Sequence, residues 1–423
     1  MAKAGAVVHD TPSPSSDQVK VMDCITAINT FNAGRDPERL NLKYQKMAEN
    51  PFVFLRGTCH WFYAILPAHA LKDSAPLTWS CGDLHLENFG SYKGDNRLVY
   101  FDINDFDEAA LAPCTWDLVR FLTSVHLGCW EVTGDSALGD TLCGIYVRAY
   151  GAALAAGKAR WVEKETANGP VRSLLEGLKG RKRVDYLDSR TILKGHRRHL
   201  NLTIGKALPV TEKQRLQVTD FMENLARESD DPTWFTVHDV ARRIAGTGSL
   251  GVDRYIVLVE GKGSPDGNYL LDLKEALPSA LSLSSDVPQP AWGSEAERVV
   301  NVQFRLQACS MAFLRAVQMS GKPYLLRGLQ PSEDRVCLLP KTSLQDWQYL
   351  METCGQVTAW AHLRGSGRQG ATGPDELIGF GQRTDWHSSM LRWALICAQQ
   401  VRADWKIWRE YYAGIEKTGE LSQ

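Results

Sequence analysis

The spacing of hydrophobic residues divides the chain into helical and β-rich stretches. Apolar positions at helical spacing predict mostly helix over residues 17–72 and again over residues 115–160. Between them lie two short runs with β character, LTWSCGD and RLVYFDI, and the stretch SYKGDN that separates them has turn composition. Residues 161–235 are polar and charged, which indicates helices around exposed loops.

A second β-rich block begins near residue 236. The segments YIVLVEG and YLLDLKEA flank KGSPDGN, which has the Gly, Pro and Asp content of a hairpin loop. Residues 294–317 predict one amphipathic helix with a Ser cap and acidic residues in its first turn. A short strand in PYLLRGL follows, and residues 343–416 are helical and rich in Trp. This order of elements predicts an α+β fold.

The composition is that of an ordinary globular protein. Hydrophobic residues make up 44% and charged residues 23%, and a net charge of -1 provides no overall field that attracts nucleic acid or anionic lipid. No apolar run reaches the roughly 18 residues that span a membrane, and the N-terminus has no secretory signal pattern. The ten cysteines form no C-x-x-C pair, which favours reduced thiols. We expect a cytoplasmic protein without nucleic-acid or membrane partners; its oligomeric state is unknown.

The stretch CGDLHLENFG at residues 81–90 concentrates polar chemistry between two glycines. Asp83 and Asn88 lie in a loop after a short apolar run, and further aspartates end the next strand and open the next helix. Strand ends fix the origins of such side chains, so their oxygens can converge on one point, an arrangement that suits Mg²⁺. A single Asp or Asn would be better explained as a cap of a turn or helix, so the set carries the interpretation. The set consists of Asp83, His85, Asn88, Asp102, Asp105, Asp107 and Asp117.

The segment GTGSLG at residues 246–251 is a G-x-G-x-x-G motif. Glycines let the backbone approach phosphate oxygens, and their N–H groups can form a nest for an anion. A dinucleotide-binding site needs a helix after the glycines, whereas the following VDRYIVLVEG is strand-like. We therefore expect a phosphate-binding loop between two strands, formed by Gly246, Thr247, Gly248, Ser249 and Gly251.

The segment GDLHLEN, followed by VYFDINDFDEA and WDL, resembles the C-terminal-lobe signature of kinase-like phosphotransferases such as aminoglycoside phosphotransferases, choline kinases and homoserine kinases. More closely, residues 35–370 resemble a bacterial family known as domain of unknown function 2252, which carries GDxHxxNFG, a DFDE stretch and a later GxGSLG with Lys-Glu-Ala. The resemblance implies a two-lobed protein-kinase-like fold with a small antiparallel-sheet nucleotide lobe and a large, mostly helical lobe. The glycine loop follows the catalytic loop by more than 150 residues instead of preceding it, which implies a circular permutation.

The resemblance also implies catalytic roles for the matching residues. Asp83 would be the catalytic base, and His85 would support its loop. Asp117 would brace the loop by hydrogen bonds. The metal ligands would be Asn88 and either Asp102 or Asp105, with Asp105 slightly favoured.

On the nucleotide side, Lys274 in LLDLKEA would bind the α- and β-phosphates of ATP. Glu297 in the following helix would pair with Lys274, and Glu295 is the second choice. Arg56 and Arg327, beside apolar runs, would contact phosphate or cap a helix.

The domain boundaries expected from this fold leave a flexible tail at 1–20. They assign the N-terminal helical segment of the large lobe to 21–75, the catalytic-loop half with its helices to 76–232, the nucleotide lobe to 233–340 and the C-terminal helices to 341–423. The acceptor pocket of small-molecule kinases is built from variable helices and loops, which correspond here to 20–75, 131–230 and 375–423.

The expected function is that of an ATP- and Mg²⁺-dependent phosphotransferase that acts on a hydroxyl or amine of a small-molecule acceptor. No H-R-D, D-F-G or A-P-E segment of regulated protein kinases occurs, which disfavours a protein substrate. Transfer of AMP on the same fold and non-catalytic nucleotide binding are alternatives. A metallophosphoesterase is a weaker alternative, because the G-N-H motif of those enzymes is missing.

Overall fold

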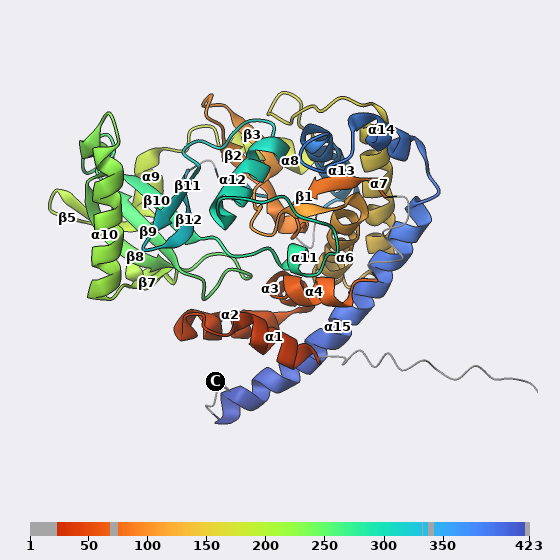
Figure 1. Cartoon of the computed structure of the whole chain (residues 1–423), viewed down its shortest axis with the longest axis horizontal. Coiled ribbons are helices and arrows are strands. Elements are labelled where there is room, and N and C mark those ends of the chain that lie inside the picture. The colour runs from red at the N-terminus through yellow and green to blue at the C-terminus, as the bar shows by residue number, and fades with distance from the viewer. Residues whose placement is uncertain (1–22, 68–74, 332, 337–341, 419–423) are drawn as a thin grey trace, which may run out of the picture.

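The computed structural model of the chain describes residues 23–67, 75–331, 333–336 and 342–418. The tail predicted at residues 1–20 lies outside this part of the chain. A large sheet lies at one end of the molecule and long helices lie at the other (Figure 1). The α+β class predicted from the sequence is therefore confirmed.

Long helices form one end of the molecule, which we call the helical region. They confirm the helices predicted over 115–160 and 343–416. In this region α13 packs along α7, and α15 packs along α6. Every residue of α6 from Cys114 to Cys129 is buried, so this helix forms the centre of the core. The helical region consists of α6 (Cys114–Thr133), α7 (Ser136–Ala155), α13 (Leu344–Gly365), α14 (Pro374–Gln382) and α15 (His387–Thr418).

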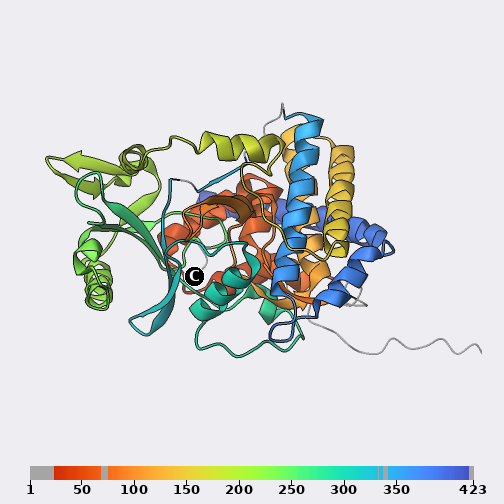
Figure 2. The ribbon, with the colours of Figure 1, turned by 90° about the horizontal axis from the view of Figure 1, so that it is seen from above.

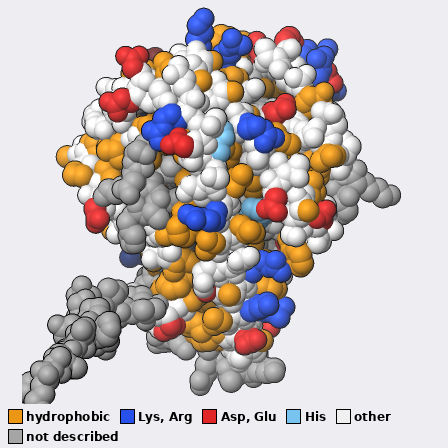
Figure 3. Space-filling model, turned by 90° about the vertical axis from the view of Figure 1, so that its right-hand side faces the viewer, with side chains coloured by type: hydrophobic (Ala, Val, Ile, Leu, Met, Phe, Trp, Pro, Cys, Tyr) orange, Lys and Arg blue, Asp and Glu red, His pale blue; other side chains and the backbone are white. Residues whose placement is uncertain are grey.

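The Trp-rich end of the chain packs largely into this core. Trp386 and Trp408 are buried, while Leu395, Ile396 and Ile407 on α15 are exposed. Figure 3 shows hydrophobic side chains in groups between charged ones on the face that carries α14 and α15. In the described part of the chain, no helix is both long and apolar enough to cross a membrane.

Four helices of the N-terminal segment lie beside α15, as Figure 1 shows. Capping side chains mark where the first three of these helices begin: Asp23 caps the first, Asp36 the second and Asn50 the third. Prolines at the first turn of the second and third helices fit the same pattern. The four are α1 (Cys24–Asn32), α2 (Pro37–Glu49), α3 (Pro51–Gly57) and α4 (Cys59–Ile65).

The sheet region is a six-stranded antiparallel sheet with the order β11-β12-β10-β9-β8-β7. Helix α10 (Glu212–Arg227) covers one face, and its Val218 and Met222 enter the core of that face. Both α10 and β7 come from the segment that the sequence analysis assigned to the large lobe, so the sheet region begins before residue 233. The strands are β7 (Ala207–Pro209), β8 (Val237–Arg243), β9 (Arg254–Val259), β10 (Tyr269–Glu275), β11 (Arg315–Met319) and β12 (Lys322–Gly328).

The single helix predicted over 294–317 is wrong in its second half. Helix α12 (Glu295–Leu306) has the predicted Ser294 cap, but the chain then forms β11, which pairs with β12. Ser320 and Gly321 between these strands both have positive φ, which a two-residue hairpin turn requires. This tight hairpin draws residues 315–319 into the sheet.

The polar stretch 161–235, predicted as helices and loops, also holds strands. The hairpin of β5 (Thr191–Lys194) and β6 (Arg197–Leu200) projects at the sheet end of the molecule (Figure 2). Further short elements of the described chain are α8 (Gly169–Gly177), α9 (Arg183–Asp188), α11 (Ala280–Leu283) and the 3-10 turns Leu86–Asn88, Leu202–Ile204 and Pro232–Phe235.

Two small sheets hold the loops that carry the GDLHLEN and DFDE motifs. Strand β1 (Leu77–Ser80) pairs with β4 (Ala110–Pro113). Between these two strands in the sequence, β2 (Phe89–Lys93) pairs with β3 (Val99–Ile103). Ser91 to Lys93 of the predicted turn SYKGDN therefore belong to a strand. The nested pairing brings the loop 81–88 beside the loop 104–109, because each loop joins a strand of one pair to a strand of the other. Strand β13 (Asp334–Arg335) extends the inner pair at β2.

Candidate functional site

A cleft of about 380 Å³ is lined by residues of the sheet region and of the loops after β1 and β3. N-terminal residues such as Phe31 and Arg35 and the 131–230 segment, through Tyr186 and Arg190, also line it. No described residue of 375–423 does. The cleft brings together the predicted residues Asp83, His85, Asn88, Asp105, Gly246, Thr247, Gly248, Ser249 and Lys274. It does not include Asp102, Asp117, Gly251 or Glu297.

Asp117 lies beneath the loop after β1 and holds its backbone. Its fully buried carboxylate accepts hydrogen bonds from the N–H groups of Cys81 (2.8 Å) and Gly82 (3.0 Å). Gly82 has φ of 83°, and a Cβ there would sit 1.9 Å from the Glu108 carbonyl oxygen. His362 Nε2 lies 3.4 Å from Asp117. The loop is thus held by a buried carboxylate and by a position that only glycine can occupy.

Asp83 is paired with Arg120, which the sequence analysis did not identify. Arg120 is buried on α6, where its Nε donates to Asp83 Oδ1 over 2.8 Å and its Nη2 donates to the Leu55 carbonyl over 3.0 Å. Burial raises the pKa of Asp83, and the Arg120 charge opposes this effect. Among the described residues, no group donates to Asp83 Oδ2. One carboxylate oxygen is therefore held in place, and the other is available to a ligand.

His85 and Asn88 hold the same loop from within. His85 Nδ1 accepts a hydrogen bond from the Glu87 N–H (3.1 Å), and burial holds the pKa of His85 well below its usual range. His85 is therefore neutral near pH 7 and serves here as a hydrogen-bond acceptor. Asn88 Nδ2 donates to the Asp83 carbonyl over 2.6 Å, which leaves its amide oxygen as the group suited to a metal ion.

The two aspartates considered as metal ligands lie in different surroundings. Asp102 is buried in β3, where it accepts hydrogen bonds from the Ile103 N–H (2.9 Å) and the Ala308 N–H (3.0 Å) and lies 3.3 Å from Arg364 Nη2. Asp105 follows β3, is exposed and lines the cleft. Only Asp105 of the pair is therefore accessible from the cleft.

Lys274 lies on β10, and its ammonium group bonds to the Asp107 carboxylate. Burial lowers the pKa of Lys274, and Asp105 opposes this effect. The predicted partner Glu297 is exposed at the start of α12 and forms no ion pair with it. The second choice, Glu295, pairs with Arg298 over 2.6 Å.

Arg298 explains why Asp107 takes the place predicted for a helix glutamate. It is buried on α12 and donates to the backbone carbonyls of Asp107 (2.9 Å), Ala109 (2.5 Å) and Leu277 (3.0 Å). These bonds hold the loop after β3 against α12. Helix α12 therefore positions Asp107, which in turn bonds to Lys274.

The glycine loop between β8 and β9 is held by α2 and by the connection between α1 and α2. The Gly248 carbonyl accepts from Arg35 Nη1 (2.9 Å) and Lys43 Nζ (3.1 Å), and the Gly251 carbonyl accepts from the Asp36 N–H (2.9 Å). The N–H groups of residues 246–249 donate to no described residue. Unpaired backbone N–H groups in succession form an anion nest, so this loop can bind phosphate oxygens.

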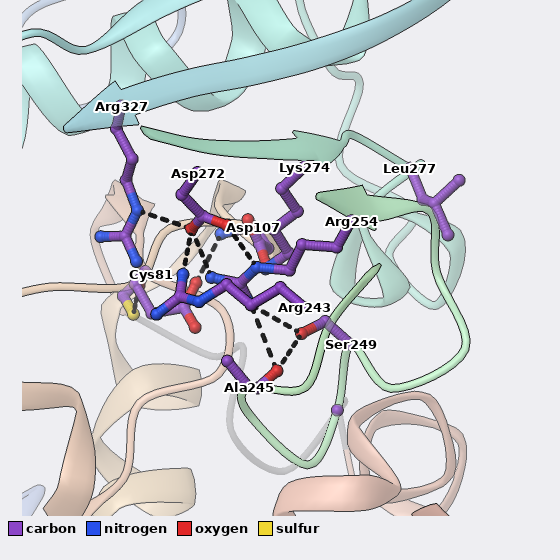
Figure 4. Close-up of polar contacts among 12 residues, drawn as sticks. Cys81, Asp107, Arg243, Ala245, Ser249, Arg254, Asp272, Lys274, Leu277 and Arg327 are labelled. Atoms are coloured by element: carbon purple, nitrogen blue, oxygen red, sulfur yellow. Dashed lines mark hydrogen bonds and ion pairs between the residues drawn. The ribbon is translucent and has the colours of Figure 1, made fainter. Parts of the chain in front are cut away.

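The sheet face above the cleft carries an arginine cluster that sequence reasoning largely missed. Arg243, Arg254 and Arg327 all pair with Asp272, which is 1% exposed (Figure 4). Of these three arginines, the sequence analysis identifies only Arg327. The available signal was the position of Arg243 and Arg254 at the two strand ends that flank the glycine loop.

Among the described residues, no three His, Cys, Asp or Glu side chains lie close enough together to hold a metal ion by themselves. Mg²⁺ usually takes one or two carboxylates together with phosphate oxygens and water, and Asp105 with Asn88 fits that smaller set. The cysteines in the described ranges are free thiols.

Comparison with known proteins identifies a family. Residues 35–411 match the family described as "Uncharacterized protein conserved in bacteria (DUF2252)". No curated protein and no solved structure matches the chain. Because the match covers most of the sequence, the chain belongs to the DUF2252 family.

Proposed function

We propose that this protein is an ATP- and Mg²⁺-dependent phosphotransferase that acts on a hydroxyl or amine of a small molecule. The observation that carries the proposal is the shared cleft, which is lined by Asp83, Asn88 and Asp105 together with the glycine loop and Lys274. Phosphoryl transfer relies on positioning and charge stabilisation, and it requires these groups together.

The proposed fold is kinase-like and circularly permuted. Support comes from a glycine loop that joins two antiparallel strands, β8 and β9, with a lysine on the next strand, β10. The acidic loops follow short paired strands against the helical region. In kinases the glycine loop covers the phosphates and a strand lysine binds them. Because the acidic loops come first in this chain, we propose that the two halves have exchanged their order.

The residues present fit both cofactors. Asp105 and the amide oxygen of Asn88 would hold Mg²⁺, while Lys274 and the N–H groups of 246–249 would hold the phosphates of ATP. When bound, Mg·ATP supplies the transferable phosphoryl group and neutralises its charge. The cytoplasmic location expected from the sequence is compatible with such a cofactor.

Asp83 is the proposed base. Arg120 fixes the orientation of its carboxylate through Oδ1, so Oδ2 is the atom that would accept the proton of the acceptor. The pKa of Asp83, raised by burial, makes it a stronger base than an exposed aspartate. His85 and Asp117 would act on the loop, not on the acceptor.

The test is to incubate the protein with an extract of small metabolites and ATP labelled at either the α- or the γ-phosphate. We expect Mg²⁺-dependent transfer of the γ-label to a small molecule. Transfer of the α-label would establish AMP transfer in its place. Transfer of neither label, together with no binding of ATP, would overturn the proposal.

The matched variants are Asp83→Asn and Asp102→Asn. Both aspartates lie beside an arginine, but only Asp83 lines the cleft. We expect transfer to fall by about 10²–10⁴-fold in the first variant and to be retained in the second.

A further inference from the structure

The face of the sheet above the cleft carries charge where a ligand pocket is usually apolar. Arg243 ends β8, Arg254 begins β9, and Asp272 and Arg327 are register partners on β10 and β12. Figure 4 shows the three guanidinium groups directed toward the Asp272 carboxylate. We call this group the basic wall. It suits an oxyanion better than an aromatic base.

Asp272 does not saturate the donors of the basic wall. Each guanidinium carries about five N–H donors, whereas a carboxylate accepts about four hydrogen bonds. Arg254 uses all its nitrogens, on Asp272, the Ala245 carbonyl and Ser249 Oγ. Among the described residues, Arg243 donates only through Nη1 and Arg327 makes no bond through Nη2. Both side chains line the cleft, so these donors are available to a ligand.

The charge of the basic wall is also unbalanced. Three guanidinium groups face Asp272. Glu333 lies 4.0 Å from Arg327, and the charges of Glu333, Asp272 and Asp105 raise the pKa of Arg327. Burial lowers the pKa of Arg243 to about 10, Asp272 opposes the shift, and Arg254 and Arg327 add to it. The mutual repulsion of these cations would be relieved by an anion.

Arg190 adds a further donor from a different part of the chain. It lines the same cleft, and its Nε is buried without a hydrogen-bond partner in the described part of the molecule. It forms no ion pair there, and its guanidinium carbon lies 5.4 Å from the centre of the Tyr186 ring. A buried unpaired guanidinium nitrogen is costly, and an oxyanion would satisfy it.

We propose that Arg243 and Arg327, which are organised around Asp272, form together with Arg190 a subsite that binds a phosphate group. The subsite adjoins the proposed catalytic groups, because a hollow of about 50 Å³ is lined by Asp105 and Lys274 together with Arg327. This assignment rests on the proposed function: the ligand is a phosphorylated acceptor, whose hydroxyl or amine would lie at Asp83. Phosphates of the nucleotide are the other source of the same group.

The experiment measures thermal unfolding of the full chain in inorganic phosphate, with chloride at matched ionic strength as the reference. We expect phosphate to raise the melting temperature with saturation, because a ligand of the native state stabilises it. Arg243→Gln should raise the phosphate Kd at least about 10-fold. Arg242→Gln is the matched control, since Arg242 is the preceding residue, is also 14% exposed, and pairs with Asp36 and Glu38 outside the cleft.

Arg190→Gln is a second variant, which leaves the Asp272 cluster intact. If Arg243→Gln shows no cooperative melting transition, the phosphate Kd of Arg190→Gln decides the test. Arg190→Gln should also raise the phosphate Kd about 10-fold. The proposal is overturned if phosphate gives no saturable shift, or if the control loses as much affinity as the cleft variants.

Titration with Mg·ATP separates this proposal from the proposed function. Variants that lose phosphate binding but keep the Mg·ATP shift assign the subsite to the acceptor. Loss of both shifts assigns the bound phosphate to the nucleotide and overturns the acceptor assignment. A wild type that responds to phosphate but not to Mg·ATP retains the subsite and contradicts the phosphotransferase.

Discussion

Two groups of residues that line the cleft carry opposite charges and are held in place by different means. The acidic wall, which we define as the loops 81–88 and 104–108, takes all its acids from one short part of the chain. The basic wall draws its arginines from strand positions between residues 243 and 327. The acidic wall is held by backbone hydrogen bonds, whereas the basic wall is held by one shared carboxylate. The first therefore depends on a local motif, and the second on the register of the sheet.

The difference also separates two tasks. An acidic wall suits a metal ion and a base, and a basic wall suits the oxyanions that such a metal ion helps to hold. Lys274 lies where the walls meet, since its ammonium group bonds to Asp107 while it belongs to the sheet.

The largest effect is expected from the acidic wall. Asp83→Asn removes the proposed base but keeps a side chain that can accept from Arg120, so transfer of the γ-phosphate should fall by about 10²–10⁴-fold. The Mg·ATP melting shift should persist. Single-turnover transfer assays with labelled ATP measure the rate, and a variant with the wild-type rate would exclude Asp83 as the base.

On the basic wall, Asp272→Asn should lower the free energy of unfolding by about 3–5 kcal/mol. The reason is that Arg243, Arg254 and Arg327 are left without their buried counter-charge. Urea unfolding measures this loss. Asp266→Asn is the control, because Asp266 pairs with Arg198 over 3.0 Å while 62% exposed and should cost less than about 1 kcal/mol. Equal losses in the two variants would mean that the Asp272 cluster has no special role in stability.

A smaller effect is expected at Glu108, on the edge of the acidic wall. Burial raises its pKa from 4.5 to about 6, and the bond from the Ala280 N–H opposes the shift. Because the folded-state pKa is the higher one, the stabilising contribution is complete below pH 4.5 and is lost as the pH rises through about 6. That loss amounts to about 2 kcal/mol.

Glu108→Gln cannot titrate, so it should remove this part of the pH dependence and exceed the wild type in stability above pH 6. Urea unfolding of both proteins at several pH values between 4.5 and 7.5 measures it. If the free energy of unfolding changes with pH in the same way in both proteins, Glu108 is not the group responsible.

The acidic wall could be read from the sequence because its spacing reports directly on local structure. Asp83 and Asn88 share one loop, and Asp105 follows a strand, so the strands alone bring them together. The choice between Asp102 and Asp105 needed the structure, since only burial separates a strand residue from one just beyond it. The partner of Asp83 was missed because Arg120 lies on the next helix, in no motif.

The basic wall could not be derived in the same way. Arg243 and Arg254 meet Asp272 only through the pairing of β8, β9 and β10, and a single sequence does not report strand register. The predicted Lys274–Glu297 pair failed for a related reason. The length of α12 and the path of the loop after β3 decide which acid reaches the lysine, and both depend on tertiary packing.

The measurement that tests the central claim most directly is the melting temperature with a non-hydrolysable ATP analogue, with and without Mg²⁺. The account predicts a Mg²⁺-dependent rise in the wild type and in Asp83→Asn, and no rise in Lys274→Ala or Asp105→Ala. A wild type whose melting temperature ignores the nucleotide would contradict the account, and so would a rise that survives both of the last two substitutions.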